Sequence, residues 1–294
     1  MKNLLQPLEG FDEQTYLRLN PDVKGAVDAN QFSSGWHHYL LYGFRENRLG
    51  VSKDVHHTVD SLFNSEQSDK QPPENLRKRV HGVGSLESFE SVGRMISLDI
   101  QSAVKIHLSL DESQAVYDFG CGCGRVIKYV SALLGKGKYY GSDIDPEAIT
   151  WCSENLESIG EFKVNEISPP LPYTADSFDF IYSISVFTHL PEYMQFEWLE
   201  ELNRVSKAGA LLLLTTHGES LLKNVPDSIL QDFKSHGFFY AVGDGTEGLP
   251  DFYQTSFHTH DYIRDRWSKY FEILDIIPRG IANHQDLVLC RKLG

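Results

Sequence analysis

The sequence predicts an α/β fold in which a mostly parallel, seven-stranded sheet carries helices on both faces and follows a small helical N-terminal module. Three observations lead to this prediction. From residue 115 onwards, short β-type runs alternate with helical segments, which is typical of a parallel sheet covered on both sides. Two further β-type runs close the chain, a pattern typical of an antiparallel edge. The length of 294 residues suits one such domain plus a small one.

The alternation can be followed segment by segment. A first helix is expected over 85–108, with Ser85 as its N-cap and an apolar stripe on one face. The runs predicted as strands are 115–119, 138–143, 161–165, 178–185, 210–216, 271–278 and 284–292. The helices predicted between them are 124–134, 146–156 and 192–206.

The first fifty residues predict two or three short helices. Pro21 is well placed to begin a helix, Ser33 or Ser34 is a candidate N-cap, and Gly43 is a candidate C-terminal stop. The pattern of "YL", "NPDV", "HYL" and a following glycine resembles a short bacterial module that accompanies transferases and surface-associated proteins. We interpret residues 1–50 as a structural element or one that docks a partner.

Domain boundaries follow from composition. Residues 51–84 are polar and contain Pro72-Pro73, which is linker composition. The α/β domain then occupies 85–294. Within it, 218–262 breaks the strand–helix alternation and is rich in aromatic residues, so we expect an insertion that caps the substrate site.

Charge and cysteine content restrict the partners and the compartment. Lys and Arg number 27 against 41 Asp and Glu, a formal net charge of −14, which argues against nucleic acid as a partner. Four cysteines do not make a disulfide framework, so a reducing, cytoplasmic environment is expected. The N-terminal residues lack the apolar core of a secretory signal, and the densest apolar run, 210–214, is too short to span a membrane.

The stretch "VYDFGCGCGRV", residues 116–126, follows the first predicted strand. Its three glycines allow a tight turn and a close approach to a ligand. A metal site is disfavoured, because Cys121 and Cys123 lack zinc spacing and no second Cys/His pair follows. A dinucleotide site remains an alternative, although the G-x-G-x-x-G fingerprint has Arg125 where its last glycine belongs. Asp143 ends the second strand, where an acidic residue can reach ribose hydroxyls.

The series "DFGCGCGR", "SDIDPEAI", "SFDFIYSISVFTHL" and "WLEELNRVSKAGALLLLTTHG" resembles the class I S-adenosylmethionine-dependent methyltransferases, which have a Rossmann-like fold. The resemblance covers about residues 85–294 and is strongest over 115–217. Within the family, the motifs are most similar to a bacterial branch that is common in glycan biosynthesis. One departure is Lys207-Ala208-Gly209, where the family has Pro-Gly at a turn. The resemblance implies S-adenosyl-L-methionine as cofactor and methyl transfer as the reaction.

The resemblance also implies roles for individual residues. The glycine loop would line the methionine part of the cofactor, Arg125 would start the following helix and brace the loop, and Asp143 would bind the ribose. Asn165 or Glu166 would contact the adenine, and 183–185 would face the cofactor and its methyl group. The implied cofactor-binding residues are Asp118, Gly120, Cys121, Gly122, Gly124, Arg125, Asp143, Ile144, Asn165, Glu166, Ser183, Ile184 and Ser185.

Transfer to a hydroxyl is helped by a base, and histidine suits neutral pH. His189 follows the fourth main strand and is our first candidate, His217 follows the fifth and is the second, and His284 precedes the last strand. No metal site is predicted. We expect O-methylation of a sugar, a glycan or another small metabolite. The alternatives are a cofactor-binding scaffold without turnover and an NAD-linked oxidoreductase.

Overall fold

The computed structural model describes residues 7–8, 10–63, 70–108, 111–222, 225–243 and 250–294. Its centre is a seven-stranded sheet in the order β3-β2-β1-β4-β5-β9-β8. The five strands β1 to β5 pair in parallel, whereas β9 is antiparallel to both β5 and β8. The predicted parallel sheet with an antiparallel edge is therefore confirmed. The strands are β1 (Ala115–Phe119), β2 (Lys138–Asp143), β3 (Gly160–Val164), β4 (Phe178–Ser183), β5 (Ser206–Thr216), β8 (Phe271–Ile281) and β9 (Gln285–Lys292).

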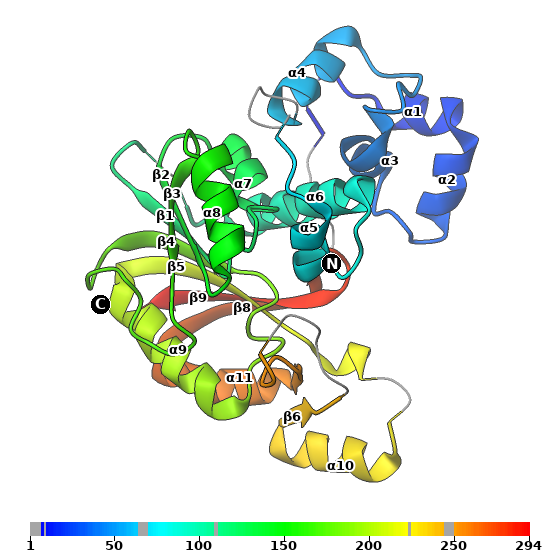
Figure 1. The fold of residues 1–294 in the computed structure, drawn as a ribbon. Coiled ribbons are helices and arrows are strands. Elements are labelled where there is room, and N and C mark those ends of the chain that lie inside the picture. Colours follow the sequence, from blue (N-terminus) through cyan, green and yellow to red (C-terminus); the bar gives the residue numbers. More distant parts are fainter. Residues whose placement is uncertain (1–6, 9, 64–69, 109–110, 223–224, 244–249) are drawn as a thin grey trace.

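Helices cover both faces of this sheet (Figure 1). One face packs on α6 and α7, through residues such as Ile100 and Val130. The other face packs on α9 and α11, through residues such as Trp198 and Ile263. The α8 helix lies on the same side as α7 in Figure 1. These helices are α6 (Leu86–Val104), α7 (Ile127–Leu134), α8 (Pro146–Asn155), α9 (Glu192–Val205) and α11 (His260–Arg266).

Most predicted boundaries agree with the structure to within a few residues, because caps and turns define them. Ser85 accepts the amide of Ser88 and so caps α6 as predicted. Four boundaries shift by three or four residues: the end of α6, the start of α7, the start of β5 and the end of β8. The helix expected from residue 124 begins at Ile127, so Arg125 lies in the turn before α7 rather than at the helix start.

The N-terminal module packs on the α/β domain instead of standing apart. Its helices share a hydrophobic cluster with Leu98 of α6 and Tyr129 of α7 (Figure 1). Pro21 begins α2 and Ser34 caps α3, as the sequence predicts. The module comprises α1 (Glu13–Leu19), α2 (Pro21–Asp28), α3 (Gly35–His38) and the π-helix η1 (Tyr39–Gly43).

The segment predicted as a linker contains two helices, α4 (Lys53–Phe63) and α5 (Glu74–His81). Val55 and Val59 of α4 belong to the core of the N-terminal module. Leu76 of α5 instead packs with Phe89 and other residues of the α/β domain. The polar composition of this segment therefore reflects short amphipathic helices rather than an unstructured connection.

The insertion after β5 forms a small layer of its own. Its strands β6 (Phe238–Ala241) and β7 (Thr255–His258) make a separate antiparallel pair. The single turn η3 (Glu219–Leu221) and α10 (Asp227–His236) precede them, and the turn η4 (Trp267–Lys269) follows α11. No helix in the described ranges has both the length and the apolar character needed to cross a bilayer.

Candidate active site

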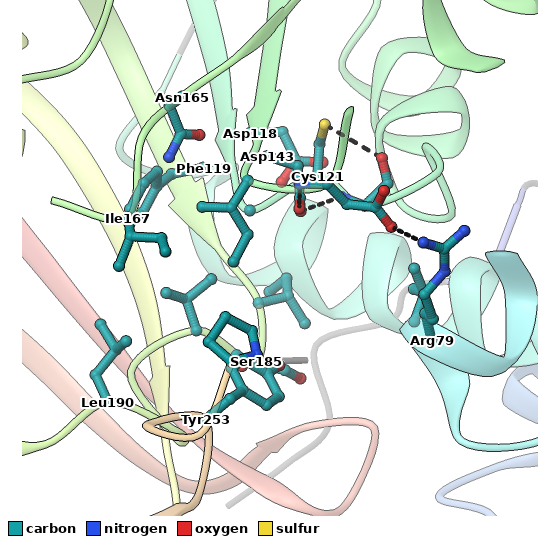
Figure 2. A pocket seen from close by; sticks show the side chains of 18 of the residues that line it. Arg79, Asp118, Phe119, Cys121, Asp143, Asn165, Ile167, Ser185, Leu190 and Tyr253 are labelled. Carbon is teal, nitrogen blue, oxygen red and sulfur yellow. Dashed lines mark hydrogen bonds and ion pairs between the residues drawn. The ribbon is translucent and has the colours of Figure 1, made fainter. Parts of the chain in front are cut away.

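A cavity of about 460 Å³ lies at the carboxyl ends of the central strands, where open α/β sheets bind ligands. Figure 2 shows Ile167 and Leu190 along one side, Arg79 on the opposite side, and Ser185 with Tyr253 at one end. The cavity is lined by Arg79, Val80, Asp118, Phe119, Gly120, Cys121, Gly122, Arg125, Val126, Asp143, Ile144, Asp145, Pro146, Asn165, Ile167, Ile184, Ser185, Val186, Leu190, Trp198, Pro250, Phe252 and Tyr253.

The glycine loop needs its glycines. Gly120, Gly122 and Gly124 have φ angles of +79°, +53° and +77°, which side-chain-bearing residues rarely adopt. A Cβ at Gly120 would lie 2.3 Å from the side chain of Val186, and one at Gly122 would lie 2.6 Å from Val80. The loop therefore turns tightly and leaves its backbone open to the cavity.

Asp143 ties this loop to the end of β2. Its Oδ2 accepts the amide of Gly122 over 2.8 Å, and its Oδ1 accepts the amide of Asp145 over 2.9 Å. Burial raises the pKa of the carboxyl, and the amide hydrogen bonds oppose that shift. Each carboxylate oxygen keeps a lone pair, so Asp143 can still accept hydrogen bonds from a ligand in the cavity.

Asp118 presents a buried carboxyl group that is incompletely paired. Only 2% of the residue is exposed, and its Oδ2 has no hydrogen-bond partner among the described residues. Burial, and then the nearby charge of Asp143, raise its pKa to about 8, while the neighbouring hydroxyl of Tyr182 and the charge of Arg125 oppose that shift. Ionising a buried carboxyl group without a partner costs free energy, so the site is suited to a ligand that brings a positive charge.

Arg125 supplies the opposite charge. Its Nη1 donates to Nδ1 of His81 over 3.1 Å, while its Nε has no partner within the described ranges. Burial lowers the pKa of the guanidinium. Because Asp118 and Arg125 both line the cavity, one ligand that carries an ammonium and a carboxylate can satisfy both.

The α5 helix closes one side of the cavity through Arg79 and Val80. Arg79 Nη1 lies 2.9 Å from Oδ2 of Asp145, and the same guanidinium pairs with Glu147. This helix lies in the segment predicted as a linker, and its part in the site was not predicted. The signal was present in the short run between Pro73 and Gly82, a helix-starting proline and a left-handed glycine stop.

The far side of the cavity is built around Asn165. Its Oδ1 accepts from the hydroxyl of Ser142 over 2.6 Å, and its Nδ2 donates to the carbonyl of Glu166. Asn165 lines the cavity, whereas the side chain of Glu166 is exposed. Three of the residues implied by the resemblance lie outside the lining: Gly124, Glu166 and Ser183. Ser183 instead donates to the carbonyl of Phe119 inside the sheet.

Ser185 is held in an unusual conformation after β4. Its φ of +64° is rare for a residue with a side chain and marks stored strain. Its amide donates to Thr215 Oγ1, its Oγ accepts from Gln285 Nε2, each over 2.8 Å, and its carbonyl accepts from the hydroxyl of Tyr253 over 3.3 Å. Tyr253 belongs to the aromatic insertion that the sequence predicts over the substrate site, whereas Gln285 was not predicted, because only the folded chain brings it to Ser185.

Neither predicted base, His189 nor His217, lines the cavity. His189 stacks on Tyr253, which does, with ring centroids 4.0 Å apart. Its Nδ1 donates to the carbonyl of Gln254 over 2.6 Å, so the neutral ring carries its lone pair on Nε2.

The two rings lie 6.1 Å apart between centroids. Burial lowers the pKa of His189, and burial with the neighbouring histidines lowers that of His217 to about 4. Both rings are therefore neutral at physiological pH. Across the described ranges, no three His, Cys, Asp or Glu side chains are placed to hold a metal ion.

Comparison with known families accounts for this arrangement. Residues 117–214, which include the glycine loop and the end of β2, match the family model described as a methyltransferase domain. The chain carries a class I S-adenosylmethionine-dependent methyltransferase domain. The family and the fold imply S-adenosylmethionine as the cofactor.

The methyltransferase domain also has similar relatives. A probable phthiotriol/phenolphthiotriol dimycocerosates methyltransferase of Mycobacterium ulcerans is 28% identical over 114 residues, 39% of this chain and 42% of that protein. The chain thus matches less than half the length of this relative.

Two solved structures are similar in fold to this chain. A protein of Pyrococcus horikoshii is 15% identical, with a TM-score of 0.50 over 66% of this chain and 88% of that chain, and confirms the fold. An S-adenosylmethionine-dependent methyltransferase of Methanosarcina mazei is 25% identical, with a TM-score of 0.49 over 64% of this chain and 97% of that chain.

The cavity of the methyltransferase domain fits this cofactor. S-adenosylmethionine contains an amino acid group, a ribose and an adenine. The orphaned Asp118 Oδ2 and Arg125 Nε supply opposite charges for the amino acid group. The glycine loop brings bare backbone to the cavity where a Cβ would collide with Val186 or Val80, and Asp143 offers lone pairs to hydroxyl groups.

Proposed function

We propose that the protein is an O-methyltransferase that uses S-adenosylmethionine to methylate a hydroxyl of a small metabolite or a glycan. The observation that carries this proposal is the pair of buried, incompletely satisfied ionisable groups, Asp118 and Arg125, in one cavity with the glycine loop. A zwitterionic amino acid group satisfies both at once, and a dinucleotide has no such group.

We assign the cofactor contacts as follows. Asp118 accepts from the ammonium, and Arg125 donates to the carboxylate. Asp143 accepts from the ribose hydroxyls, since both its oxygens are already oriented by backbone amides. Ile144 and Asn165 border the adenine. The buried setting of these groups strengthens each interaction relative to water.

Bound S-adenosylmethionine supplies a methyl group activated by a positively charged sulfur. The protein has to align the acceptor and take up its proton, and alignment alone contributes roughly 7–11 kcal/mol to such reactions. We assign the proton to Nε2 of His189, whose lone pair is fixed by the bond from Nδ1 to Gln254. The ring is separate from the lining and stacks on Tyr253, so this assignment requires the proton to pass that side chain. His217 supports this ring by contact and is the second candidate.

Calorimetry tests the proposal directly. Wild-type protein is titrated with S-adenosylmethionine and, separately, with NAD. We expect micromolar binding of S-adenosylmethionine that Asp143→Ala weakens, and no binding of NAD. Transfer of a labelled methyl group to a panel of hydroxyl compounds then tests turnover. Absence of S-adenosylmethionine binding would reject the proposed function, and binding without turnover on any acceptor would favour the scaffold alternative.

A further inference from the structure

The cavity has two chemically different ends. One end carries the charged groups Asp118, Arg125 and Asp143, which the proposed function assigns to the cofactor. The other end is formed by the loop after β4, by α9 and by the insertion. Its surface is an apolar wall, which we define as Val186, Leu190, Trp198, Pro250 and Phe252, together with Phe119 of β1, whose ring contacts Trp198.

The apolar wall is rigid where it is described. Phe119 and Trp198 are in ring contact, with centroids 4.8 Å apart, and are 3% and 2% exposed. Leu190 is likewise buried in the same core. Packed aromatic and aliphatic side chains of this kind do not rearrange to offer hydrogen bonds, so the wall selects for an apolar surface on the acceptor.

The side-chain hydroxyls at this end of the described lining belong to Ser185 and Tyr253, and the indole of Trp198 adds one N–H donor. The hydroxyl of Tyr253 already donates to the carbonyl of Ser185. The Oγ of Ser185 accepts from Gln285, so its own proton is left to donate into the cavity. Gln285 is a buried residue whose Oε1 has no partner in the described part of the chain.

Ser185 therefore offers one directed hydrogen bond in an apolar setting. The amide of Ser185 donates to Thr215 and its carbonyl accepts from Tyr253, which holds the left-handed backbone, while Gln285 donates to the side-chain Oγ. Strain maintained in this way at the end of a central strand fixes where the hydroxyl points. Gln285 does not line the cavity and acts as a positioning residue through Ser185.

We propose that the acceptor presents its hydroxyl from an aryl or alkyl group rather than from a free sugar, and that Ser185 is the group that recognises this hydroxyl. The inference rests on the proposed function and names its acceptor class. A free sugar placed against the apolar wall would leave several hydroxyls unpaired, and each unpaired buried hydroxyl weakens binding. An aryl group with a single hydroxyl gains from the wall and pairs its one polar group with Ser185, which lies beside Tyr253 in Figure 2.

Two probes test the acceptor class: 1-naphthol and methyl α-glucopyranoside, titrated by calorimetry into full-length protein saturated with S-adenosylhomocysteine. We expect 1-naphthol to bind at submillimolar concentration and the glucoside to give no heat. Phe252→Ser should weaken 1-naphthol at least fivefold. The matched control is Tyr193→Ser, which removes an aromatic ring that is 63% exposed and outside the cavity, and it should leave binding unchanged.

A second comparison isolates Ser185. Ser185→Gly keeps the left-handed backbone and removes the hydroxymethyl side chain. It should weaken the binding of 1-naphthol several-fold and leave the binding of 1-methylnaphthalene, which lacks a hydroxyl, unaffected. Gln285→Met should weaken 1-naphthol in the same direction by releasing Ser185.

The outcomes separate the two proposals. If S-adenosylhomocysteine itself fails to bind, the proposed function and this inference both fall. If S-adenosylhomocysteine binds but the glucoside binds as tightly as 1-naphthol, the inference alone is overturned. It is also overturned if 1-naphthol fails to bind, or if Phe252→Ser and Tyr193→Ser have the same effect.

Discussion

Arg125 donates a hydrogen bond from Nη1 to Nδ1 of His81 over 3.1 Å, across 44 residues of sequence. Arginine can only donate, so Nδ1 of His81 is unprotonated and its Nε2 pairs with Ser88 Oγ over 2.7 Å. Burial and the charge of Arg125 lower the pKa of His81, which keeps the ring neutral. The helix before the methyltransferase domain thereby orients a guanidinium in the cofactor cavity.

His81→Ala should weaken S-adenosylmethionine binding about tenfold, because a hydrogen bond to a charged group contributes about 1.5 kcal/mol. Calorimetric titration measures the change. His57→Ala is the matched control, since His57 is exposed on α4. Equal effects of the two substitutions would show that His81 does not orient Arg125.

Asp118→Asn should weaken the binding of S-adenosylmethionine at least tenfold. It should leave the binding of 5′-methylthioadenosine, which lacks the amino acid group, nearly unchanged. The reason is that Asn keeps the size of Asp118 but removes the charge that we assign to the ammonium. Asp143→Asn should weaken both ligands, since Asp143 is assigned to the ribose. Parallel titrations of the two ligands check the assignment, and loss of 5′-methylthioadenosine binding in Asp118→Asn would contradict it.

The residues of the site that lie at strand ends were predictable, because short sequence patterns locate the strands and the turns that follow them. The glycine loop, Asp118 and Asp143 lie at strand ends that alternation and turn chemistry locate. Gln285 and Ser185 are 100 residues apart and meet because β9 runs antiparallel to β5, where Thr216 pairs with Asp286. No short-range pattern encodes that register, so sequence reasoning missed Gln285.

The sequence does not distinguish between adjacent residues as candidates for the cavity lining. Asn165 and Glu166 are adjacent, and the side chains point to opposite environments, one buried and one exposed. A shift of one residue in the strand register decides which of the two side chains faces the cavity, so the sequence alone could not choose between Asn165 and Glu166. The same uncertainty placed Ser183 in the site beside Ser185.

Stability should fall as the pH drops below 6.5. Burial lowers the pKa of His258 to about 3, and its Nε2 donates to Oε1 of Gln195. The unfolded chain takes up a proton near pH 6.5 and the folded protein does not, so falling pH favours unfolding. At pH 5 this histidine alone lowers the unfolding free energy by about 2 kcal/mol.

Urea unfolding at pH 7.5 and pH 5 measures this dependence. His258→Gln cannot be protonated and should reduce the difference between the two pH values by about 2 kcal/mol. His236→Gln is the control, because His236 is exposed on α10. An unchanged pH dependence in His258→Gln would show that another group is responsible.

Glu90→Ala should destabilise the protein by about 3–5 kcal/mol, because it leaves buried cations without a counter-charge. Glu90 Oε1 pairs with Lys128 Nζ over 2.6 Å, and Arg94 Nη1 lies 3.9 Å from Oε2. Arg94 also donates to the carbonyl of Leu41, so the cluster ties the N-terminal module to α6. Glu87→Ala, on the exposed face of the same helix, should change stability by less than about 0.5 kcal/mol in the same urea experiment.

His189→Gln should lower kcat about a hundredfold and leave KM within twofold, because the ring is assigned to proton uptake and not to binding. The wild-type kcat/KM should fall as the pH drops below a midpoint lower than 6.5, since burial lowers the pKa of His189 and only the neutral ring accepts a proton. His189→Gln should lose this acidic limb, and His217→Gln should keep it with a smaller loss of rate. Methyl transfer to the acceptor found in the panel, measured from pH 5 to 8, distinguishes the two histidines. If His217→Gln instead abolishes the limb, the base is His217, and the contact with His189 serves to position it.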